Sequence, residues 1–199
     1  MTARVWRQPV PGLAFNPDTH EYQYQGTKIP SVTSILSAVG HVYKSQAMEM
    51  AWKRGTAVHL ATQYFDEGRL DPKSVDPILI PYLTAYIAFL GDVQPEILLT
   101  EQPVYHPVLQ YAGTADRVVK INGVTGVLDI KTGSAPMHTN PQLAAYYAAL
   151  KTPFEMTGGK WCLVLKSDGT YKLSSAPELD HWEMFKAALV IYRWKERHS

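Results

Sequence analysis

The sequence predicts an α/β protein in which helices flank a mixed β-sheet. Helical patterns occupy much of the chain before residue 95, and runs rich in β-branched and aromatic residues follow it. A further helical pattern then separates three predicted strands from a hairpin, and a last helix follows. This order of helices, strands, helix, hairpin and helix is typical of an α/β sandwich.

The elements expected in the N-terminal region, residues 1–95, are a β-hairpin over residues 12–28, a short helix over residues 31–40, and longer helices over residues 45–65 and 76–90. Ser31 is a suitable N-cap for the short helix, and Gly40 suits its end. Pro77 suits the first turn of the third helix, because an N–H is not needed there.

The elements expected in residues 96–199 are strands over residues 97–105, 111–121 and 124–131, a helix over residues 140–150, a hairpin of residues 159–166 and 170–173, and a final helix over residues 178–197. Asn140 followed by Pro141 predicts an N-cap and a first helical position. Cys162 lies in an apolar run and is expected to be a buried strand residue. A single cysteine supports neither an intrachain disulfide nor an iron–sulfur cluster.

Composition predicts a single domain, residues 1–199, and narrows the classes of function. Of the 199 residues, 46% are hydrophobic, and 19 basic side chains nearly balance 18 acidic ones. This composition excludes a disordered tail and a protein that coats nucleic acid by charge alone. No apolar signal segment is visible, and the apolar residues 78–90, interrupted by Pro81, are too few to cross a bilayer. We expect a soluble protein of a reducing compartment.

Two aspartates are predicted to face one another across the hairpin of the second and third strands. Asn122-Gly123 is the favoured dipeptide of a two-residue type I′ turn. Counting back from this turn places Asp116 opposite Asp129, with Cβ atoms roughly 5 Å apart. Strand alternation puts Lys131 on the same face as Asp129. Facing carboxylates repel each other, and a divalent cation between them reverses the sign of the interaction.

These groups suit Mg²⁺ or Mn²⁺, with the Ile130 carbonyl as a further oxygen near the carboxylates and water completing the coordination shell. The alternative is a solvated sheet surface on which Lys131 and Lys120 neutralise the two aspartates. The hairpin alone leaves both interpretations open.

Four further residues are candidates for the same site. His59 follows Gly55 by one helical turn, and the glycine would let another backbone approach. Glu101 precedes the hairpin, and Gln142 and Tyr146, spaced i, i+4, share one helix face. Each has a structural alternative: a packed helical histidine, a surface charge on an edge strand, and an amphipathic helix whose tyrosine belongs to the core.

The ordered set of these motifs resembles the PD-(D/E)xK nuclease superfamily, in its RecB-like branch with Cas4-type nucleases and phage exonucleases. The motifs are G-x-x-x-H (residues 55–59), an isolated glutamate (Glu101), G-x-x-D (113–116), D-x-K-T (129–132) and Q-x-x-x-Y (142–146). Within that branch the chain is most similar to the mitochondrial genome-maintenance exonucleases and their phage and bacterial relatives, over about residues 30–194. Some members carry a cysteine cluster, which this chain lacks, and that points to the cluster-free exonucleases.

The resemblance implies a restriction-endonuclease-like core and a metal-dependent DNA exonuclease that acts on single strands or free ends in replication, repair or recombination. It implies that Asp116, Asp129 and the Ile130 carbonyl hold Mg²⁺ or Mn²⁺, with His59 as an additional ligand. Glu101 would hold a water or a second ion. It also implies a cytoplasmic protein of a bacterium or phage-infected cell, with recombination or replication proteins as partners.

The remaining implied roles concern the attacking water and the DNA. Lys131 would position the water, and Gln142 and Tyr146 would orient Lys131 or a backbone phosphate. The candidate DNA contacts lie on the His59 helix, where aromatic side chains beside basic ones suit single strands: Trp52, Lys53, Arg54 and Tyr64. For Trp52 and Tyr64, packing in the core is a competing interpretation.

Two other functions remain open at this stage. One is a double-strand-dependent recombination exonuclease of the phage type, and the other is an inactive nuclease fold that serves as a DNA-binding subunit. Cleavage polarity, the number of metal ions and the oligomeric state do not follow from the sequence.

Overall fold

The structure is a computed structural model that describes residues 9–17, 19–40, 46–151, 154–176 and 180–198. Its centre is a five-stranded sheet in the order β4-β5-β6-β7-β8, formed by Glu96–His106, Tyr111–Ile121, Val124–Thr132, Gly159–Leu165 and Tyr171–Ser175. β6 and β7 pair in parallel, and the other neighbours pair antiparallel. The predicted mixed sheet is confirmed.

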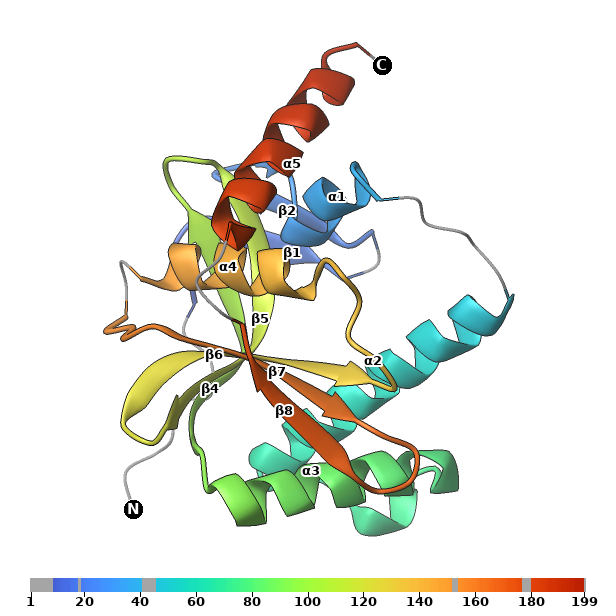
Figure 1. The fold of residues 1–199 in the computed structure, drawn as a ribbon. Helices are drawn as coiled ribbons and strands as arrows, with labels where there is room; N and C mark the ends of the chain where they lie inside the picture. The colour runs from blue at the N-terminus through green and yellow to red at the C-terminus, as the bar shows by residue number, and fades with distance from the viewer. Residues whose placement is uncertain (1–8, 18, 41–45, 152–153, 177–179, 199) are drawn as a thin grey trace.

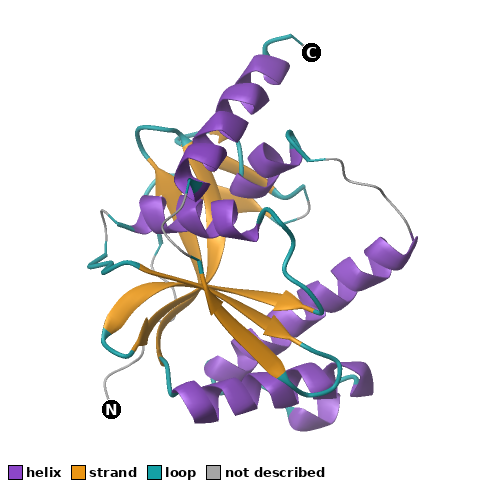
Figure 2. Ribbon diagram, viewed as in Figure 1, coloured by secondary structure: helices purple, strands orange, loops and turns teal. Residues whose placement is uncertain are grey.

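Helices cover both faces of this sheet (Figures 1 and 2). One layer is formed by α1 (Val32–Ser37), α4 (Thr139–Leu150) and α5 (His181–Glu196), and the other by α2 (Gln46–Asp66) and α3 (Ile80–Val93). α4 connects the parallel strands β6 and β7, which need a crossover connection.

Alternate sheet residues supply two separate hydrophobic cores. Val118 and Val127 pack with α1, α4 and α5, whereas Val119 and Leu128 pack with α2 and α3. Successive side chains of a strand point to opposite faces, so strands buried on both sides appear as the continuous apolar runs seen in the sequence. Cys162 belongs to the first core and is buried in β7, as predicted.

The N-terminal hairpin prediction is incomplete, because residues 12–28 belong to a three-stranded antiparallel sheet. The strands are β1 (Leu13–Asn16), β2 (Glu21–Tyr24) and β3 (Thr27–Ile29). Gln25 and Gly26 both have positive φ, 50° and 80°, which is the conformation of a tight type I′ turn. That turn adds the third strand, which is only three residues long.

Two predicted helix starts differ from the structure. The segment expected as one helix over residues 76–90 begins with a 3₁₀ turn, Pro77–Leu79, before α3. A second short 3₁₀ turn covers Pro72–Ser74. Asn140 is not an N-cap: α4 begins at Thr139, after His138. Pro141 is tolerated at the third helical position because the first four N–H groups of a helix have no intrahelical acceptor.

The start of α1 agrees with the sequence, whereas its end comes earlier than expected, because Ala38 and not Gly40 is the C-cap. Ser31 caps α1, and its Oγ accepts a hydrogen bond from the Ser34 N–H at 3.0 Å. The predicted helix starts near residues 45 and 178 lie outside the described residues, and α2 and α5 are described from Gln46 and His181. Among the described helices, none has the length and apolar character needed to cross a membrane.

Candidate active site

The candidate site lies where β5 and β6 part. The Asn122-Gly123 turn has φ of 49° and 81°, as a type I′ turn requires, and the register that it sets places Arg117 opposite Leu128. That pair is the last one of the ladder between the two strands. The next position along each strand is one of the two predicted aspartates.

A side chain continues the contact between the strands beyond that last pair. The Asp116 Oδ2 accepts a hydrogen bond of 2.7 Å from the backbone N–H of Ile130. The predicted register is therefore right, but Asp116 and Asp129 do not form a regular ladder pair. Because Asp116 takes over a bond that a backbone carbonyl would otherwise make, its carboxylate is fixed at the point where the strands separate.

Asp129 and Lys131 form a buried ion pair. Lys131 Nζ lies 2.7 Å from Asp129 Oδ2, which confirms that both residues share one face of β6. Asp129 is 1% exposed, and neither of its carboxylate oxygens accepts a well-formed hydrogen bond from the described residues. Burial raises the pKa of Asp129 to about 6, Lys131 opposes this shift, and Asp116 adds to it. A buried carboxylate in this condition is suited to accept a cation.

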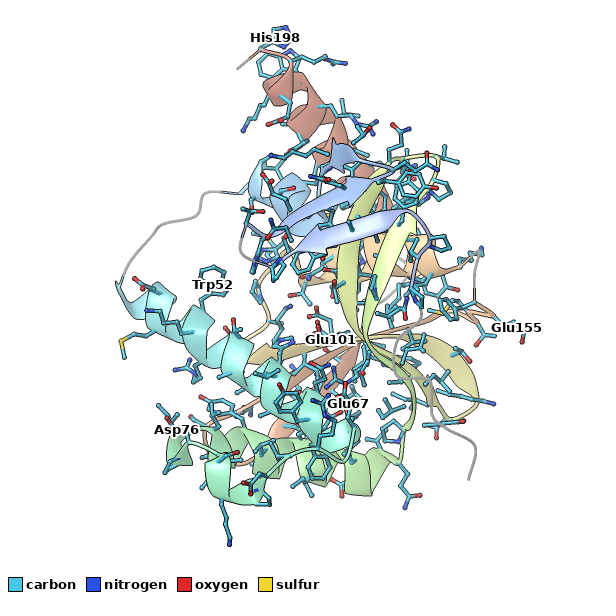
Figure 3. All side chains as sticks on the ribbon, turned by 180° about the vertical axis from the view of Figure 1, so that it is seen from behind. Trp52, Glu67, Asp76, Glu101, Glu155 and His198 are labelled. Carbon is cyan, nitrogen blue, oxygen red and sulfur yellow. The ribbon has the colours of Figure 1, made fainter. Side chains whose placement is uncertain are left out.

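Three residues from three elements form a cluster of metal-ligating groups. One ligand atom each from His59, Glu101 and Asp116 lies within 4.8 Å of the others, and His59 Nδ1 is 3.4 Å from Asp116 Oδ2. His59 comes from α2, Glu101 from β4 and Asp116 from β5. Figure 3 shows Glu101 near the centre of the molecule. Glu101 thus lies on an edge strand, as the surface-charge interpretation has it, but its side chain is largely buried beside the other two residues of the cluster.

Glu101 has a strained backbone. Its neighbours in the β4–β5 ladder pair with Arg117 and Ala115, so Glu101 lies across from Asp116. Its φ is 45°, in the left-handed region that costs a non-glycine residue on the order of 1–3 kcal/mol. Such strain is found where surrounding contacts hold a side chain in a functional position.

A fully buried arginine lies behind the cluster, and its role was not anticipated from the sequence. Arg117 Nε is 2.6 Å from Asp66 Oδ2, and Nη1 is 3.3 Å from Glu101 Oε1. Nη2 donates to Thr62 Oγ1 at 3.1 Å, and the Tyr86 hydroxyl donates to Asp66. Burial raises the pKa of Asp66, and the Arg117 charge opposes this shift. The only sequence signal was the position of Arg117 directly after Asp116.

Gln142 and Tyr146 meet at the edge of the same site. Gln142 Nε2 donates a hydrogen bond to the Tyr146 hydroxyl at 3.1 Å, and both side chains line the pocket that contains Lys131. Gly113 makes room for the tyrosine ring, since a Cβ at this position would lie 2.7 Å from Tyr146 Cε1. Gly55 is less constrained than expected, because an added Cβ would meet Thr132 Oγ1 at an ordinary 3.7 Å.

One pocket of about 690 Å³ joins these groups. Its lining includes His59, Glu101, Asp116 and Lys131. The N-terminal sheet and the turn between β1 and β2 supply further lining residues that the sequence did not identify: Phe15, Pro17, His20 and Tyr22. Their signal in the sequence was weak, because aromatic residues in short strands, such as Phe15 and Tyr22, are ordinarily core residues, and Pro17 and His20 lie in a turn.

The four predicted DNA contacts on α2 do not form one surface. Trp52 projects toward the N-terminal strands (Figure 3), with its ring 6.5 Å from that of His20. Lys53 pairs with Glu49 on the exposed side of the helix, and Arg54 lies over the ring of Tyr82 in α3. Tyr64 lies near the other end of α2, beneath Arg69. Successive residues of an α-helix point to different sides, because one turn takes about 3.6 residues. Of the four residues, only Trp52 therefore lies near the pocket.

Comparisons with known proteins found likeness in structure only. No family model matches the chain, and no curated protein sequence matches it. Among solved structures, the chain is similar to LHK-Exo in complex with dAMP, at 14% identity over 84% of this chain and 87% of that one, with a TM-score of 0.47. It is also similar to SSO0001, at 16% identity over 81% and 82% of the two chains, with a TM-score of 0.37. At this level of likeness, the side chains of the site have to carry the functional assignment.

Proposed function

We propose that the chain is a metal-dependent deoxyribonuclease of the PD-(D/E)xK type that hydrolyses phosphodiester bonds as an exonuclease. The observation that carries this proposal is the cluster of His59, Glu101 and Asp116 beside the buried pair of Asp129 and Lys131. A protein that only binds DNA has no need for carboxylates held together at such a cost in repulsion and burial.

The donor set fits a hard divalent cation. Carboxylates supply the oxygen ligands that Mg²⁺ and Mn²⁺ prefer, and an imidazole is accepted more readily by Mn²⁺. The Asp129 oxygens, buried without a well-formed hydrogen bond, offer further ligand atoms. In this proposal Asp116, Asp129 and the Ile130 carbonyl hold the ion, with His59 as an additional ligand. Glu101 holds a water or a second ion.

The side chains around the cation would prepare a phosphate for attack. A bound cation of this kind neutralises phosphate charge and lowers the pKa of water. Lys131, held in place by Asp129, donates hydrogen bonds to the attacking water or to the charge that develops on the phosphate. Gln142 and Tyr146, which are hydrogen-bonded to each other, orient Lys131 or a phosphate of the same strand.

The substrate in this proposal is DNA with unpaired bases or free ends, bound by the whole chain acting as one nuclease domain. A near-neutral net charge of +1 gives little non-specific attraction to DNA. The pocket therefore has to supply most of the affinity. A role in replication, repair or recombination, with proteins of those processes as partners, is part of the same proposal.

Labelled single-stranded and duplex DNA, incubated with the protein in Mg²⁺, Mn²⁺ or chelator, tests this function directly. We expect metal-dependent degradation of single strands that Lys131→Ala abolishes while the circular dichroism spectrum is retained. Lys120→Ala is the matched control, because Lys120 is an exposed lysine of the same hairpin, and it should keep wild-type activity. Normal turnover by folded Lys131→Ala contradicts the proposal.

The same assay separates the alternatives. Equal degradation of blunt duplex and single strands would indicate a double-strand-dependent recombination exonuclease. Binding of DNA without degradation in any metal would indicate an inactive nuclease fold that serves as a binding subunit. Labels at the 5′ and 3′ ends also give the polarity of cleavage.

A further inference from the structure

Four aromatic side chains form a continuous group that extends from the lining of the pocket to α2. We call Phe15, His20, Tyr22 and Trp52 the aromatic wall. The ring centroids of Phe15 and Tyr22 are 4.6 Å apart, those of Phe15 and His20 are 5.8 Å apart, and those of His20 and Trp52 are 6.5 Å apart. Trp52 comes from α2, and the others come from the N-terminal sheet and its first turn.

The aromatic wall is anchored on the strand that carries Asp116. The Tyr22 hydroxyl lies 2.8 Å from Thr114 Oγ1, two residues from Asp116 on β5. His20 Nδ1 lies 2.8 Å from the Pro17 carbonyl oxygen, which holds the imidazole in place. The Tyr22 and His20 rings are therefore held in place relative to the carboxylates, and ordering these two rings on binding costs little entropy.

The outer rings of the wall are left in water although they are large and apolar. Phe15 is 46% exposed and Trp52 is 69% exposed. Phe15, His20 and Tyr22 line the same pocket as Asp116, Glu101 and Lys131. A ligand that fills this pocket consequently meets flat apolar surfaces on one side and, once a cation is bound to the carboxylates, groups suited to a phosphate on the other.

We propose that the aromatic wall is a nucleobase-stacking subsite, which holds an unpaired base of the DNA strand whose phosphate lies at the cluster of His59, Glu101 and Asp116. This proposal rests on the proposed nuclease function. A nucleotide combines a flat π-system with an adjacent anion, which matches the two sides of the pocket. A base within a duplex has both faces covered by its neighbours, so the wall selects single-stranded DNA or frayed ends.

The wild-type protein tests the subsite without any substitution. Fluorescence anisotropy in Ca²⁺, under conditions in which gel analysis shows no cleavage, compares a short labelled oligodeoxythymidine with the same oligonucleotide in which abasic residues replace the thymidines. A divalent cation is kept in the assay because the carboxylates of Glu101 and Asp116 would otherwise repel the phosphate. Because stacking of one base on an aromatic side chain contributes about a tenfold or larger gain in affinity, we expect the abasic strand to bind about tenfold more weakly or worse. Equal affinities would overturn the proposal.

Substitutions locate the effect on the wall. Phe15→Leu and Trp52→Leu remove a ring but keep an apolar side chain, and each should lower the affinity for oligodeoxythymidine about tenfold while leaving that for the abasic strand unchanged. Phe15→Tyr should restore binding. Trp194→Leu is the matched control, because Trp194 is 55% exposed on α5 and does not line the pocket. Equal losses on both strands, or none on either, would contradict stacking.

Failure of this inference is distinguishable from failure of the proposed function. A protein that degrades DNA in Mn²⁺ but binds both oligonucleotides equally is a nuclease without the subsite. A protein that discriminates between the oligonucleotides but degrades neither has the subsite without nuclease activity.

Discussion

At the scale of single residues, the site depends on charges that the protein holds away from water. Asp129 is almost fully buried, and its two compensating neighbours are Lys131 at 2.7 Å and, in the proposed function, a cation. Burial raises the pKa of Asp129 to about 6, so the metal-free carboxyl competes for a proton well above its usual range. Metal affinity and protonation are therefore coupled at this residue.

A stability measurement in chelator checks that shift. A pKa that is raised in the folded state makes folding take up a proton, so Asp129 stabilises the fold most below pH 4 and loses this contribution as the pH rises through about 6. Relative to Asp129→Asn, the wild type should gain about 2 kcal/mol of unfolding free energy between pH 6 and pH 4. Urea unfolding at both pH values measures the difference.

The Asn variant is the internal control for this measurement, because it keeps every other carboxylate and replaces the Asp129 carboxyl with an amide of similar size that does not titrate. A difference between wild type and variant that stays constant from pH 4 to pH 6 would show that Asp129 has an ordinary pKa.

At the scale of elements, α2 is held on the sheet by a buried arginine. His59, Thr62 and Asp66 are spaced so that they share one side of α2. His59 reaches the metal-ligating cluster, while Thr62 and Asp66 contact Arg117 of β5. The pairing that attaches α2 to β5 thus also sets the position of His59, and Arg117 extends it to Glu101 at 3.3 Å.

Two substitutions on α2 compare a buried with an exposed ion pair. Asp66→Ala leaves the buried guanidinium of Arg117 without its 2.6 Å partner, and we expect it to lower the unfolding free energy by about 3–5 kcal/mol. Glu49→Ala removes the exposed partner of Lys53 and should cost less than about 1 kcal/mol. Chemical denaturation of both variants measures these values, and similar small losses would show that Arg117 does not secure α2.

At the scale of the whole molecule, the site is assembled from segments distant in the sequence. α2, β4, β5 and β6 each supply part of it, and the N-terminal sheet closes the pocket through Tyr22 and Thr114. A cation that binds only this assembled arrangement stabilises the entire fold, because the unfolded chain has no such site.

Thermal unfolding checks this linkage. An excess of Mn²⁺ over chelator should raise the midpoint temperature, by an amount equivalent to about 2.7 kcal/mol at a hundredfold excess over the dissociation constant. Mg²⁺ should give no larger a shift, because an imidazole ligand favours Mn²⁺. His59→Ala should reduce the Mn²⁺ shift, whereas His198→Ala, at an exposed histidine, should not. A shift unaffected by His59→Ala would exclude His59 as a ligand.

Local chemistry made much of the fold predictable. The Asn122-Gly123 turn set the register of β5 and β6, and Ser31 marked the start of α1. Lys131 was correctly placed beside Asp129, because strand alternation depends only on counting residues. The third N-terminal strand was missed because three residues carry too little pattern, and the start of α4 was misplaced because proline is tolerated at more than one early helical position.

The sequence by itself determined the register of the hairpin formed by β5 and β6, the shared face of Asp129 and Lys131, and the spacing that puts Gln142 beside Tyr146. Each follows from neighbours within one element or one turn. Only the tertiary structure decided that His59 and Glu101 meet Asp116, that Arg117 is buried against Asp66, and that Phe15, His20 and Tyr22 line the pocket. Those contacts join residues far apart in the chain, where packing of helices and sheets, and not local periodicity, sets the distance.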